Sequence, residues 1–65
     1  PDLAMSLNNQ SNRLAALGRH EEALTAITHA VEIRETLAQQ RPEVFTEPLK
    51  RSIQLRKLLE EMSEE

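Results

Sequence analysis

The 65-residue sequence contains no cysteine, tryptophan or tyrosine, and it has only one glycine and one phenylalanine. Without cysteine there is no disulfide and no thiolate metal site, and nothing points to an oxidising compartment. A single glycine cannot build a glycine-rich phosphate loop. The lone aromatic residue, Phe45, leaves no platform on which single-stranded nucleic acid could stack. These absences argue against three ligand classes before any motif is considered.

Strong charge of one sign and long apolar runs are also missing. The formal net charge is −3, from eight basic and eleven acidic residues that are intermixed along the chain. A nucleic-acid-binding module normally carries a basic face, so this balance argues against one. No apolar run reaches the length of a membrane span, and no signal segment opens the chain. We therefore expect a cytoplasmic protein. The opening Pro1-Asp2 lacks an initiator methionine, and we expect a piece cut or designed from a longer protein.

Apolar periodicity predicts a first helix over about residues 2–17. Asp2 can cap its start, and Gly18 follows its end, where a left-handed C-terminal cap belongs. Residues on one face recur at alternating steps of four and three. These residues are Leu3, Leu7, Gln10, Leu14 and Leu17.

A second helix is predicted over about residues 21–40, with Glu21 and Glu22 in its first turn. Its apolar arc is broad, so we expect this helix to pack on more than one neighbour. Arg34 falls near the middle of the arc. We expect its stem to lie along the groove with the charged head at the edge, and a specific ion pair is the alternative. The arc comprises Ala23, Leu24, Ala26, Ile27, Ala30, Val31, Ile33, Leu37 and Ala38.

Pro42 interrupts the helical pattern, because it disfavours helix at the residue before it. We expect Phe45 to pack against the base of the hairpin. A third helix is predicted over about residues 47–62, with Pro48 tolerated in its first turn. Both connections are short, so successive helices should be antiparallel neighbours. The sequence therefore predicts one all-α domain, a helical hairpin followed by a capping helix.

An internal echo and the hairpin pattern together point to a repeat protein. The segment 3–7 (LAMSL) is matched in kind at three of five positions 46 residues later by 49–53 (LKRSI). Within the hairpin, large and small residues alternate as they do in the tetratricopeptide repeat, and the run 18–24 (GRHEEAL) is the most characteristic part. The chain resembles that family at Leu7, Leu14, Gly18, His20, Ala23, Ile27 and Ala30.

The resemblance is closest to the elongated repeats of actinobacterial proteins, which are similar to those of kinesin light chains. It covers residues 1–45 as one repeat and implies that residues 46–65 form a capping helix. Gln10 and Ser11 replace the usual Leu-Gly pair, and Glu35 replaces the closing proline of a shorter repeat. The family implies a non-catalytic scaffold that binds proteins.

Residues that could carry catalysis or bind a metal are not arranged to do so. His20 and His29 are nine positions apart, about 180° around one helix, and cannot share a metal within the chain. The pairs Glu21-Glu22 and Glu60-Glu61 are adjacent, so their side chains diverge, whereas acid–base catalysis needs two carboxylates facing one substrate. We expect no enzyme activity, no cofactor and no metal.

Two surfaces are candidates for binding. The resemblance places Met5, Asn8, Asn9 and Asn12 on the concave side of the first helix, where asparagine amides could bond to an extended peptide. The alternative is that they pack between stacked repeats. On the third helix an apolar stripe would mark an interface if left bare, unless the hairpin wraps around more of the helix. That stripe is Leu55, Leu58, Leu59 and Met62.

The predicted function is a protein–protein interaction and assembly scaffold that binds a protein or peptide and self-associates, with a dimer favoured. The alternative is a regulatory or sensor repeat segment of a larger signalling ATPase or protease. No nucleic acid and no membrane is expected as a partner.

Overall fold

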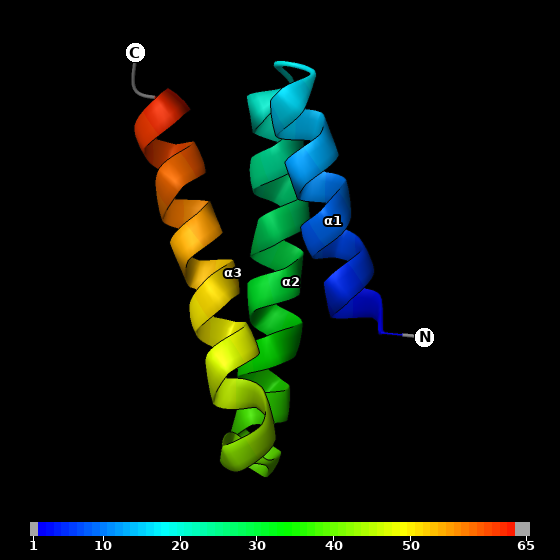
Figure 1. Cartoon of the computed structure of the whole chain (residues 1–65), viewed down its shortest axis with the longest axis vertical. Helices are drawn as coiled ribbons and strands as arrows, with labels where there is room; N and C mark the ends of the chain where they lie inside the picture. The colour runs from blue at the N-terminus through cyan, green and yellow to red at the C-terminus, as the bar shows by residue number, and fades with distance from the viewer. Residues whose placement is uncertain (1, 64–65) are drawn as a thin grey trace.

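The chain folds into three α-helices, seen in a computed structural model that describes residues 2–63 and contains no strand within them. α1 spans Leu3–Ala16, α2 spans His20–Gln40 and α3 spans Pro42–Ser63. Successive helices run in opposite directions, and both α1 and α3 pack on α2, which lies between them (Figure 1). The predicted helical hairpin with a third helix is confirmed. Positions 1, 64 and 65 of the predicted module lie outside the described residues.

The turn between α1 and α2 depends on Gly18. Its φ of +79° is in the left-handed region that glycine adopts without strain. The Gly18 N–H donates to the carbonyl of Ala15 at 3.0 Å, and the Arg19 N–H donates to that of Leu14 at 2.8 Å. These two hydrogen bonds satisfy carbonyl groups in the last turn of α1. At the other end of α1, the Asp2 carboxylate caps the first turn. Both predicted caps are therefore present.

The start of α3 differs from the prediction. The helix begins at Pro42 and not near position 47, and Arg41 alone separates it from α2. Pro42 occupies the first helical position, where its missing N–H has no bond to lose, and Arg41 is extended with φ −140° and ψ 75°. Pro48 consequently lies inside the helix and not in its first turn. The predicted boundary at residue 46 also falls within α3.

The core lies along α2, where its small and branched residues meet both neighbours. The apolar arc predicted for this helix is buried or half-buried throughout. Leu59 of α3 completes the cluster from one side, and residues of α1 complete it from the other. Phe45, in the first turns of α3, is half-buried. The central buried cluster consists of Ala23, Ile27, Ala30 and Leu59.

The leucine stripe predicted for α1 is only partly buried. Leu7 and Leu14 pack against the core cluster, but Leu3 and Leu17 are 63% and 71% exposed. Ala4, the direct neighbour of Leu3, is 1% exposed, so the first turn of α1 is packed and Leu3 points away from that contact. Gln10, in the middle of the stripe, is exposed as well, so the predicted stripe was wrong at Leu3, Gln10 and Leu17.

Small residues are buried where α1 packs on α2. Ala4 and Ser11 of α1 are fully buried, as is Ala23 on the facing helix. The Ser11 hydroxyl donates to the carbonyl of Ala23 at 2.8 Å. Small side chains allow the two backbones to approach closely, and the hydroxyl finds a partner where water is excluded. Ser11 is thus a small residue that is buried between the helices and whose polar group is satisfied.

Candidate protein-binding face

A chain of buried hydrogen bonds links all three helices. The Arg34 guanidinium, only 7% exposed, donates through Nη1 to the Ser52 hydroxyl at 2.7 Å and to the Pro48 carbonyl at 3.0 Å. Ser52 in turn donates to Oδ1 of Asn8 at 3.2 Å. Within the described residues, no buried side-chain nitrogen or oxygen lacks a partner. These hydrogen bonds therefore fix the positions of α1 and α3 relative to α2.

The buried head of Arg34 corrects the expectation that it would lie at the edge of a groove. Its two acceptors come from α3, and the only ion pair within residues 2–63 joins Arg19 to Glu22. A guanidinium carries several donors, so neutral acceptors can satisfy it without a carboxylate. Sequence reasoning missed this role because it treated Ser52 only as a match to Ser6. Ser6 is exposed, so the two serines have different environments.

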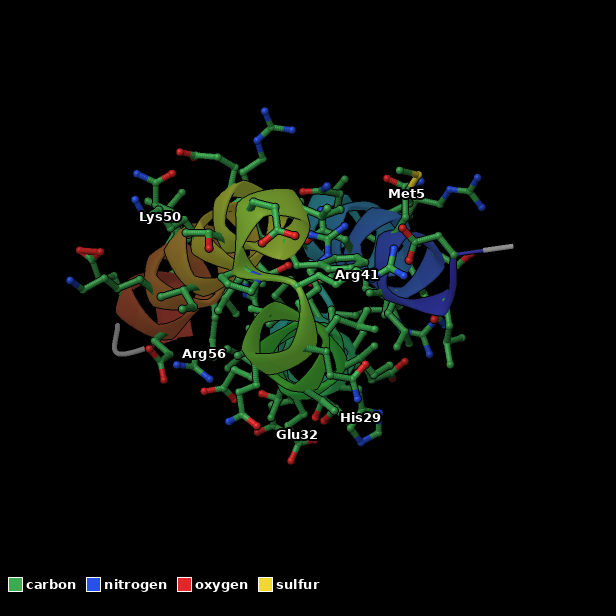
Figure 2. All side chains as sticks on the ribbon, turned by 90° about the horizontal axis from the view of Figure 1, so that it is seen from below. Met5, His29, Glu32, Arg41, Lys50 and Arg56 are labelled. Carbon is green, nitrogen blue, oxygen red and sulfur yellow. The ribbon has the colours of Figure 1, made fainter. Side chains whose placement is uncertain are left out.

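The α1 candidates divide between a structural and an exposed role. Asn8 is half-buried and accepts the bond from Ser52, whereas Asn9 and Asn12 are exposed and Met5 is 53% exposed. Met5 precedes Asn8 by three residues and Asn12 follows it by four, so both lie along the same side of the helix. In Figure 2 the labelled Met5 lies on the side of the molecule away from α2.

The α3 candidates divide in the same way. Leu59 is 1% exposed inside the core, and Leu55 packs half-buried against that core. Leu58 and Met62 remain 57% and 50% exposed. The hairpin thus covers half of the predicted stripe, so the stripe is not fully exposed. Only Leu58 and Met62 are available for contact with another molecule.

Met5, Asn12, Leu58 and Met62 lie on one side of the molecule, which we call the α1/α3 face. On a helical wheel, Leu58 and Met62 lie on the flank of α3 opposite to Arg56. Figure 2 shows Arg56 on the flank nearer α2 and Met5 on the far side, with His29 and Glu32 of α2 at the opposite edge of the molecule. Met5 of α1 and the pair Leu58 and Met62 of α3 therefore point to the same side.

The remaining candidate groups do not converge. His20 is half-buried at the start of α2, and His29 is exposed. Within residues 2–63, no three histidine or acidic side chains come close enough to hold a metal ion. None of the described helices is both long enough and apolar enough to cross a bilayer.

Comparison with known proteins identifies no relative of this chain. No protein-family model matches it, and neither the curated proteins nor the solved structures give a significant match. The tetratricopeptide resemblance therefore stays a prediction.

Proposed function

We propose that this chain is a non-catalytic interaction and assembly module of the tetratricopeptide type, which binds protein through the α1/α3 face. The observation that carries the proposal is the exposure of Met5, Leu58 and Met62 on that face, each at half of its surface or more. Large apolar side chains that are exposed on one side of a small domain support a protein interface there.

Polar groups on the same face support a protein partner. Asn9 and Asn12 are exposed and carry amides that donate and accept hydrogen bonds. Asn8 is already bonded to Ser52, so it contributes to the position of α1 and not to ligand contact. The first helix carries no lysine, which disfavours a clamp for a C-terminal carboxylate. An interface that combines apolar anchors with a polar rim fits this arrangement best.

Self-association is part of the proposal, because a domain of this size buries little of its surface and gains from a partner. Sedimentation equilibrium of the unmodified chain is expected to give a dimer at high micromolar concentration. The variant Leu58→Gln/Met62→Gln is expected to weaken the dimer by about tenfold or more, because each substitution removes an apolar anchor without adding charge.

The matched control is Leu3→Gln/Leu17→Gln, which removes two equally exposed apolar side chains outside the α1/α3 face. Its dimer should be as stable as that of the unmodified chain. A chain that stays monomeric at high micromolar concentration contradicts the self-association. Equal weakening by both variants contradicts the assignment of the face.

A further inference from the structure

Within residues 50–61, the exposed side of α3 carries basic residues near the start and an acidic residue at the end, and the exposed Glu47 lies one turn before this segment. Lys50 and Arg51 lie in the first half of the helix, and Glu61 lies in its last turn, all three exposed. Ten positions, about 15 Å of helix, separate Arg51 from Glu61. Between them the exposed residues Gln54 and Leu58 continue the same side of the helix at steps of three and four. From Arg51 to Glu61, this side of the helix thus runs from positive through uncharged to negative.

The charge at the C-terminal end is unfavourable for an isolated helix. The last turn of α3 contains Glu60 and Glu61 and no basic residue, although a helix C-terminus favours cations. Neither carboxylate has an ion pair within the described residues. A positive group from another molecule would offset this charge.

We propose that α3 pairs antiparallel with α3 of a second copy of this chain, which rests on the self-association proposed above. In a two-fold arrangement centred near Arg56, Arg51 lies opposite Glu61 of the second copy, and Gln54 lies opposite its Leu58. The same surface serves on both copies, as a two-fold interface requires. Reversal of direction makes each end complementary to the other, whereas a parallel pair would place like charges together.

The shape of α3 supports the same occupant. A shallow, open hollow of about 530 Å³ lies along the surface of α3 alone, and its lining residues are Glu47, Lys50, Arg51, Ile53, Gln54 and Lys57. The antiparallel arrangement brings the exposed Leu58 of the second copy to the level of Gln54, over this hollow. The aliphatic stems of the basic residues there can cover an apolar side chain while their charges stay in water.

Charge reversal tests the direction of pairing. Arg51→Glu and Glu61→Arg should each weaken the dimer by about tenfold, because each places like charges opposite one another. The combined variant Arg51→Glu/Glu61→Arg should restore the dissociation constant of the unmodified chain. The control Glu60→Arg changes the same helix turn by the same charge, but its side chain points about 100° away and should not weaken the dimer. Circular dichroism of each variant confirms that it is folded.

Cross-linking tests the same geometry without charge effects, because the sequence has no native cysteine. A mixture of Arg51→Cys and Glu61→Cys chains should form a disulfide between the two variants on oxidation, and neither variant should cross-link to itself. Self-linked Arg51→Cys would overturn the antiparallel arrangement.

The outcomes separate this inference from the function on which it rests. A monomeric unmodified chain defeats the proposed self-association itself. The dimer could instead be weakened by Leu58→Gln/Met62→Gln but not by the charge reversals, and give no mixed cross-link. That result contradicts only the antiparallel pairing.

Discussion

At the scale of single residues, Ser52 is the side chain that joins all three helices. Its hydroxyl accepts from Arg34 of α2 and donates to Asn8 of α1, so one small side chain connects three helices. Ser6, which matches it in the internal echo, is exposed on α1. The same residue type, in a partly similar local sequence, thus has a structural role at one position only.

Ser52→Ala is expected to lower the free energy of unfolding by about 1–2 kcal/mol, because the buried guanidinium and the Asn8 amide both lose a partner. Ser6→Ala, the matched control, should change it by less than about 0.5 kcal/mol. Urea unfolding followed by circular dichroism measures both. Equal effects would show that the hydrogen bonds of Ser52 add nothing to stability.

At the scale of elements, α3 is the helix that contains a proline in its interior. Pro48 lies in its second turn, where a residue with an N–H would bond to the carbonyl of Val44. The Pro48 carbonyl nevertheless accepts from Arg34, which ties this part of the helix to α2. Tertiary contacts therefore hold a helical segment that local preference disfavours.

Pro48→Ala is expected to raise the free energy of unfolding by about 1–2 kcal/mol, since it restores a backbone donor inside the helix. Pro42→Ala is the control, because proline at the first helical position loses no bond, and its effect should stay within about 0.5 kcal/mol. Thermal unfolding of both variants makes the comparison. A loss of stability in Pro48→Ala would mean that the packing of the proline ring outweighs the missing bond.

At the scale of the whole molecule, stability depends on a core that is very small. Four fully buried residues form its centre, three from α2 and Leu59 from α3. Domains of this size rarely exceed about 3–5 kcal/mol in stability from their core alone. Removing one large side chain from this cluster should therefore cost nearly the whole free energy of unfolding.

Leu59→Ala is expected to cost about 2–4 kcal/mol, because it leaves a cavity between α2 and α3. Its neighbour Leu58 is more than half exposed, so Leu58→Ala should leave the unfolding of the monomer within about 0.5 kcal/mol of the unmodified chain. Far-ultraviolet circular dichroism at 25 °C, at a concentration too low for association, separates the two. A similar loss of unfolding free energy in both variants would contradict the finding that Leu59 is buried and Leu58 is exposed.

The sequence by itself determined the three helices and most of their limits. Asp2, Gly18 and Arg41-Pro42 act through contacts or steric limits within a few residues, so local chemistry sets these boundaries. The broad apolar arc of α2 also predicted correctly that this helix would have two neighbours. Periodicity is sufficient for that inference, because it depends on one helix alone.

Only the tertiary structure decided which members of each pattern are buried. Leu58 and Leu59 are adjacent and chemically identical, yet one is exposed and the other lies in the core. Ser6 and Ser52 differ in the same way, and the head of Arg34 turns inward because acceptors on α3 face it. These outcomes depend on how far one helix is rotated against another, and no single helix contains that information.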